Sequence, residues 1–135
     1  MRDDIEGRDS IFDLALGDLY TRAPDSLQVE LYNWYFDREE EYFTDRAKDY
    51  VRNFVELVNK HRSNVWFSNV YYAKSKLALY LFNTKDAIES ASQAFYYASL
   101  TNNPELEIKS MLLLGTSLES NNKKVEAFKK YIDAS

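Results

Sequence analysis

No cysteine occurs in this chain of 135 residues, and it contains only two prolines, three glycines and one histidine. Without cysteine, disulfide bonds, thiolate catalysis and cysteine-ligated zinc are excluded. The shortage of glycine and proline argues against a β-rich fold, because such a fold needs many tight turns. No stretch approaches the roughly 18 apolar residues of a membrane-spanning helix, and the acidic start lacks the apolar run of a signal peptide. We therefore expect a cytoplasmic, helical protein with no membrane partner.

Residue patterns that carry catalysis are also missing. The one histidine, His61, lies in the charged stretch NKHRSN, where no nucleophile and acid accompany it as a catalytic triad requires. The glycines, Gly7, Gly17 and Gly115, are isolated and form no phosphate-binding loop. The sequence therefore predicts a protein that is not an enzyme and holds no cofactor.

Charge is distributed unevenly along the chain. Residues 1–45 hold thirteen acidic and four basic residues, whereas residues 46–135 hold nine acidic and thirteen basic ones. The acidic first part and the net charge of −5 argue against a nucleic-acid partner. On a helix, Asp37, Glu40 and Glu41 would share a face that could attract a hard cation. A solvated acidic face is the favoured interpretation, and no metal is expected.

The chain divides into two unequal parts. We expect residues 1–9 to form a flexible acidic N-terminus and residues 10–135 to form a single helical domain. The string IEGR at residues 5–8 matches a protease-cleavable linker used in protein expression, with natural sequence as the alternative.

Apolar residues recur at spacings of three and four almost throughout, which is the pattern of amphipathic helices. The pair Asn103-Pro104 is a strong helix start, and Asn121-Asn122 is expected to form a turn. Short connections make neighbouring helices antiparallel. The predicted all-α fold has about seven helices, at residues 10–20, 25–43, 45–60, 65–82, 85–100, 104–120 and 123–135.

A repeated spacing links the last four predicted helices. Its two copies, 36–37 residues apart, are Leu77, Ala78, Leu81, Ala91, Phe95, Ala98 and Leu114, Gly115, Leu118, Ala127, Tyr131, Ala134. Small residues let two helices of a hairpin approach closely, and the aromatic residue fills the gap to the next hairpin. We therefore expect Gly115 to lie inside a helix at a point of close approach.

This spacing resembles the tetratricopeptide repeat, in which a Leu-Gly pair, a large residue and an Ala-aromatic-Ala set span a helical hairpin. The resemblance covers about residues 65–135 and, loosely, residues 25–60. It implies that the helices stack as hairpins with a concave binding face. A generic helical bundle with alanine at its tight contacts is the alternative.

The stretch from Tyr71 to Tyr131 also resembles the repeat region of peptide-sensing regulators of bacteria and their phages, namely the aspartate-phosphatase regulators of quorum sensing and the arbitrium receptors. The shared features are a tyrosine-rich first helix, a second helix containing SQAFYYA, and asparagine-rich turns. That family binds short peptides, often through asparagine side chains. The present chain is much shorter, and no helix-turn-helix precedes its repeats.

In a tetratricopeptide hairpin, the first helix lines the concave face. Asparagine suits such a face because its amide both donates and accepts hydrogen bonds. The binding residues predicted from this geometry are Asn69, Tyr72, Lys76, Leu79, Asn83, Lys109, Thr116 and Glu119. The sequence thus predicts a non-catalytic module that binds a peptide or another protein, acting as a regulatory adaptor of bacterial or phage origin.

Bulky aromatic residues crowd the segment LYNWYFDREEEYF, where Tyr32, Trp34, Tyr35 and Phe36 are nearly consecutive. Consecutive residues of a helix point in different directions, so these rings cannot all face one core. The favoured interpretation is a helix sandwiched between two neighbours, with Trp34 in the core. The alternative is a small structural subunit or antagonist that docks or dimerises through residues 27–43, with Trp34 as an interface anchor.

Overall fold

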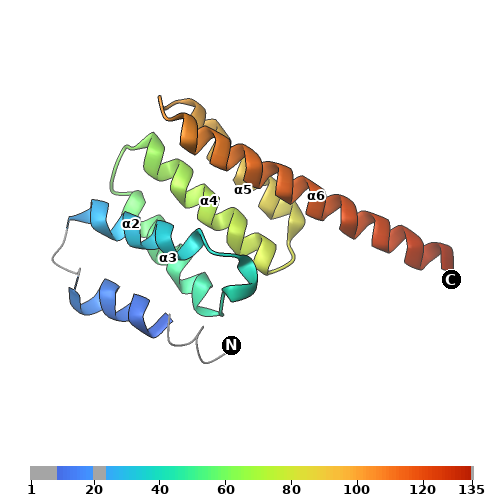
Figure 1. The fold of residues 1–135 in the computed structure, drawn as a ribbon, viewed down its shortest axis with the longest axis horizontal. Helices are drawn as coiled ribbons and strands as arrows, with labels where there is room; N and C mark the ends of the chain where they lie inside the picture. The colour runs from blue at the N-terminus through green and yellow to red at the C-terminus, as the bar shows by residue number, and fades with distance from the viewer. Residues whose placement is uncertain (1–8, 20–23, 135) are drawn as a thin grey trace.

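The computed structural model describes residues 9–19 and 24–134, and the fold of these residues is all-α, with no strand (Figure 1). They form six helices where about seven were expected. The expected acidic segment, residues 1–9, lies outside the described residues except for Asp9. In chain order the elements are a helix from residue 9 to 14 that continues as the π-helical turn η1 (Ala15–Leu19), α2 (Asp25–Phe36), the 3₁₀ turn η2 (Glu40–Tyr42), α3 (Arg46–Val58), α4 (Asn64–Tyr80), α5 (Thr84–Ser99) and α6 (Pro104–Ala134).

Three helices begin at a side-chain cap. Ser63, Asn83 and Asn103 each accept a hydrogen bond of 3.2 Å from the backbone N–H three residues further on. Such caps satisfy N–H groups that have no partner within the helix. The start predicted at Asn103-Pro104 is confirmed.

The helix predicted over residues 25–43 is wrong at its C-terminal end, because α2 stops at Phe36. The acidic residues that follow are unfavourable at a helix C-terminus, because the negative end of the helix dipole lies there. The chain leaves the helix at residues 37–39 and forms η2 instead. This turn brings Phe43 back into the core, where its ring stacks on that of Tyr35 at 5.4 Å.

The turn predicted at Asn121-Asn122 and the separate seventh helix are also wrong. Residues 104–134 form one continuous helix of 31 residues. Asparagine costs a helix only a few tenths of a kcal/mol, and neither glycine nor proline occurs after Gly115 in this stretch. The Thr84 hydroxyl also donates a 2.8 Å hydrogen bond to the Asn121 side chain, which ties α6 to the start of α5. The second copy of the repeated spacing therefore lies on a single straight helix.

The first half of the chain packs around an aromatic core. Rings from residues 9–19, α2, α3 and the segment after η2 contact one another in edge-on, tilted or stacked arrangements, at centroid distances of 4.6–5.8 Å. The buried aromatic side chains of this core are Phe12, Tyr32, Tyr35, Phe36, Phe43, Tyr50 and Phe54.

The second half packs through small residues. α5 contacts both α4 and α6, and it turns four fully buried alanines towards them, namely Ala87, Ala91, Ala94 and Ala98. Two serines of α4 face this row: Ser68 donates a 2.8 Å hydrogen bond to the Ala94 carbonyl, and Ser75 a 2.7 Å bond to the Ala87 carbonyl. Two buried serines of α6, Ser110 and Ser117, complete the contact. We call these eight residues the Ala/Ser seam.

Gly115 is correctly predicted to lie inside a helix, but the expected close approach is absent. A side-chain carbon built at this position would meet no atom within 4 Å, and Gly115 is exposed. The small residues that do meet a neighbouring helix are those of the Ala/Ser seam, on a different side of α6.

Candidate functional site

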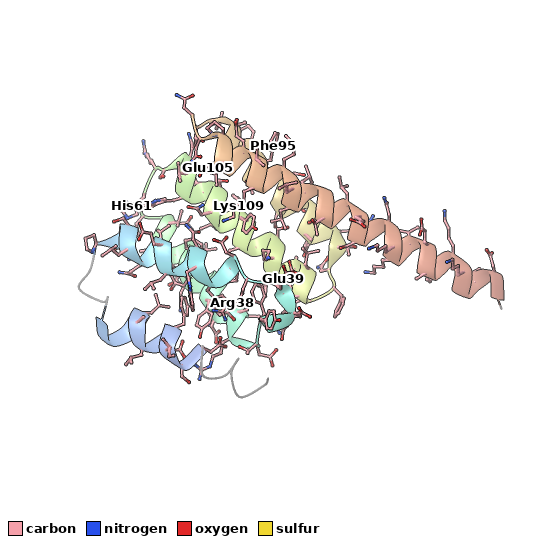
Figure 2. All side chains as sticks on the ribbon, viewed as in Figure 1. Arg38, Glu39, His61, Phe95, Glu105 and Lys109 are labelled. Atoms are coloured by element: carbon pink, nitrogen blue, oxygen red, sulfur yellow. The ribbon has the colours of Figure 1, made fainter. Side chains whose placement is uncertain are left out.

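The candidate binding residues predicted on the concave face do not form one site. Tyr72, Lys76 and Lys109 meet between α4, α6 and η2. The ammonium of Lys109 lies 4.4 Å from the centre of the Tyr72 ring and pairs with Asp37, just beyond α2 (Figure 2). The ammonium of Lys76 pairs with Glu40 at 3.2 Å, and the Lys76 side chain is almost entirely buried.

These contacts connect helices within the chain. The pKa of Tyr72 is raised to about 12, mainly by burial and also by the nearby carboxylates of Asp37, Glu40 and Glu39, which disfavour a further negative charge. Two of the three carboxylates that were predicted to share a helical face are therefore paired with lysines. Their face does not form, since α2 ends before them.

Three other predicted residues lie apart from this cluster. Asn69 is buried within α4. Asn83 caps α5 and donates a 2.6 Å hydrogen bond to Asp86. Glu119 is exposed on α6 and pairs with Lys123 one turn further on.

Leu79 and Thr116, the remaining predicted residues of α4 and α6, line a groove of about 610 Å³. Its floor and walls are mainly apolar, with Tyr80 and Phe82 from the end of α4 and the turn that follows. Ser120 and Lys124 extend it along α6, and Glu40 and Glu41 of η2 close its other side. We call this the α4–α6 groove.

A second groove of about 770 Å³ lies where α6 leaves the bundle. Its walls come from the start of α5 and the second half of α6, and they carry two lysines and no acidic residue. The residues that line it are Asn83, Thr84, Lys85, Asn121, Lys124, Val125, Ala127 and Phe128. We call this the tail groove. It shares Thr84 and Lys124 with the α4–α6 groove, so the two form one continuous surface.

The second half of α6 projects beyond the other helices, and its side chains extend to all sides (Figures 1 and 2). Leu118, Val125, Phe128 and Ile132 are all about half exposed or more. Their spacing of seven, three and four places them along one side of the helix. The projecting part of α6 therefore carries an apolar row without a partner in the described part of the chain.

Phe82, which lines the α4–α6 groove, has an unusual backbone conformation. It is 81% exposed, and its φ of 58° lies in the left-handed region, where it is the one non-glycine residue of the described chain. The N–H groups of Phe82 and Asn83 donate hydrogen bonds of 3.1 and 2.8 Å back to Leu79 and Ala78. This is the Schellman motif that ends many helices, usually with glycine at the left-handed position.

Trp34 does not lie in the core as the favoured interpretation expected. Its side chain is 53% exposed. One face of the indole stacks on Phe12 with ring centres 6.2 Å apart, and the Arg38 guanidinium lies 4.7 Å from the ring centre. Phe12 reaches the interior instead, because α2 is covered on one side only at this position.

The repeated spacing in the sequence included Ala91 and Ala98 of the Ala/Ser seam, but its four serines were not recognised. The signal that could have revealed them is the spacing of seven between Ser68 and Ser75, repeated between Ser110 and Ser117. His61, the one histidine, is partly buried. It bonds Asp25 at 2.7 Å and meets the Trp66 ring edge-on, which ties the start of α2 to the start of α4.

The described chain is thus an all-α protein with two connected apolar grooves and a projecting amphipathic helix. No known protein family, curated protein or solved structure matches it. Among residues 9–19 and 24–134, no helix combines the length and apolar character needed to cross a bilayer.

Proposed function

We propose that this protein is a non-catalytic interaction module that binds a peptide or a helix of another protein in the α4–α6 groove. The observation that carries the proposal is the groove itself, which is mainly apolar, has a volume of about 610 Å³ and is lined by the predicted residues Leu79 and Thr116. Concave apolar surfaces with a few polar groups at their edges are typical of ligand sites. Lys124 and Glu41 at the rim supply such groups.

The arrangement of the last three helices supports a tetratricopeptide-like module. α4 and α5 are consecutive, closely packed helices, and α6 packs against both. In such a module α4 and α6 are the first helices of successive units, and the groove between them is its concave face. A role as a regulatory adaptor of bacterial or phage origin accords with this arrangement.

The proposal is tested by selecting binders from a displayed library of random peptides about 20 residues long. Thr116→Arg places a bulky cation in the α4–α6 groove and should abolish binding of the selected peptides. Met111→Arg is the matched control, because Met111 is exposed on the same helix, about 140° around its axis. Selected peptides that bind both variants equally well would place recognition elsewhere and contradict the proposal.

A second candidate function is docking or dimerisation through the aromatic segment, residues 27–43. The observation in its favour is the exposed indole of Trp34, since tryptophan is a frequent anchor at protein interfaces. A sedimentation experiment on the wild type and on Trp34→Ala tests this candidate. Association that disappears in the variant would support this candidate, and a monomeric wild type would exclude dimerisation.

A further inference from the structure

Phe82 has a backbone conformation that costs free energy, and its side chain is exposed. An L-residue in the left-handed region loses roughly 1–2 kcal/mol relative to ordinary conformations, and glycine avoids this cost. The position is one where helices usually carry glycine. A large apolar side chain that is both strained and 81% exposed contributes little to the stability of the chain. Backbone outliers of this kind concentrate at functional sites.

The surroundings of Phe82 indicate what it contacts. Phe82 lines the α4–α6 groove, and this groove shares Thr84 and Lys124 with the tail groove. The Lys124 ammonium donates a hydrogen bond of 3.4 Å to the Phe82 carbonyl, so the lysine lies beside the exposed ring. The apolar row of α6 continues this surface along the projecting half of the helix.

The geometry of the surface fits a helix as its occupant. From Leu118 to Ile132 the apolar row is straight and spans about 21 Å, at 1.5 Å per residue. Residues spaced by three, four and seven on a helix are the anchors that amphipathic helices use when they pack side by side. Lys124, on the same helix as this row, connects it to Phe82 through the hydrogen bond to the Phe82 carbonyl.

The charge of the surface indicates which kind of helix it fits. Lys85 and Lys124 line the tail groove, and no carboxylate does. Lys124 and Lys129 lie on opposite sides of the apolar row on α6. Carboxylates along the flanks of a partner helix would complement these lysines.

We propose that the tail groove, the apolar row and Phe82 bind an amphipathic helix of a partner protein whose apolar face is flanked by glutamate or aspartate. This inference rests on the proposed function and specifies its partner. Phe82 acts as the anchor, and Lys85, Lys124 and Lys129 select for acidic flanks.

Two labelled helical peptides of 21 residues test the proposal by fluorescence anisotropy. Both carry leucine at the a and d positions of three heptads; one has glutamate at the flanking e and g positions, and the other has lysine. The glutamate peptide should bind, more weakly as salt is added, and the lysine peptide should not. Phe82→Gly and Lys124→Glu should each weaken binding by about tenfold or more. Lys48→Glu makes the same charge change on α3, at an exposed position, and should leave binding unchanged.

Phe82→Gly relieves strain, so the variant should stay folded, and Phe128→Glu offers a second exposed position on the same surface. Equal binding of the two peptides would overturn the selection for acidic flanks. Self-association that Phe82→Gly abolishes would identify a second copy as the occupant and overturn the proposal. If the glutamate peptide fails to bind while library peptides still require Thr116, this inference is wrong and the proposed function stands. Failure of both experiments would contradict both this inference and the proposed function.

Discussion

The side-chain oxygens of Ser75 and Ser117 lie 3.4 Å apart, although the two residues are 42 positions apart in the sequence and belong to different helices. Ser68 and Ser110 repeat the same relationship one heptad earlier, also at 3.4 Å. All four side chains are fully buried against the alanines of α5. The small size of these residues lets three helices meet, and each serine hydroxyl finds a partner at the contact, so burial leaves it satisfied.

Ser117→Leu should overpack this seam. The fully buried site has no room for three additional carbon atoms, and we expect the free energy of unfolding to fall by about 1–3 kcal/mol. Urea denaturation followed by circular dichroism measures this change. The control is Thr116→Leu, which places the same side chain on the adjacent, exposed position and should change stability by less than about 0.5 kcal/mol. Equal effects at the two positions would mean that α6 does not use this side for packing.

Gly115 should behave as an ordinary solvent-facing helix position. Since a side chain there would meet nothing within 4 Å, Gly115→Ala should raise the free energy of unfolding by about 1 kcal/mol, the helix penalty of glycine. Gly115→Leu should stabilise to a similar degree. Thermal denaturation of both variants measures the effect. A destabilised Gly115→Leu variant would instead support the close helix approach that the sequence predicted.

Phe82→Gly should stabilise the chain even as it removes a large side chain. The relief of left-handed strain is worth roughly 1–2 kcal/mol. The greater freedom of glycine in the unfolded chain offsets part of this gain, so we expect a net rise of about 1 kcal/mol. Phe82→Ala removes the ring but keeps the strain, and should therefore be less stable than the glycine variant. Denaturation midpoints of the two variants, if identical, would show that the conformation of Phe82 carries no strain.

The buried tyrosines make the fold sensitive to alkaline pH. Burial raises the pKa of Tyr32, Tyr35 and Tyr72 to about 12, whereas an unfolded tyrosine ionises near pH 10. The neutral form of these side chains is the one that the folded state favours. Their contribution to stability is therefore complete below pH 10 and is lost as the pH rises from 10 through 12.

Ultraviolet absorbance of tyrosinate, recorded with the helical circular dichroism signal, measures this transition. Tyr72→Phe should remove one late-ionising group and reduce the loss of stability. Tyrosines that all ionise together near pH 10, with the helical signal intact, would contradict the burial of these three side chains.

Trp34→Ala should cost little stability. The indole is half exposed, and its stacking on Phe12 and under Arg38 is worth about 1 kcal/mol. Phe36→Ala, on the same helix but almost fully buried, should cost about 3–5 kcal/mol. Guanidinium denaturation compares the two variants. A loss of 3 kcal/mol or more in Trp34→Ala would show that Trp34 is part of the core.

The sequence by itself determined the helical class and several helix starts of this protein, because both depend on local physics. Apolar spacing of three and four sets the face that a helix buries, and the Asn103-Pro104 pair starts α6 through its own side chain and restricted backbone. The candidate residues Leu79 and Thr116 came from the resemblance to a tetratricopeptide hairpin, and both line the α4–α6 groove.

Only the tertiary structure decided which helix faces would be covered. The sequence predicted that Gly115 and Trp34 would pack against neighbouring helices. Whether a neighbouring helix is present depends on segments far away in the chain, and both positions are exposed. Ser75 and Ser117 have the opposite fate. From sequence alone, a serine is expected at the surface unless a hydrogen-bond partner for its hydroxyl is known. The partners of Ser75 and Ser117 at this contact lie on other helices. Long-range pairing of this kind leaves no local trace beyond a spacing of seven, so packing in three dimensions decided it.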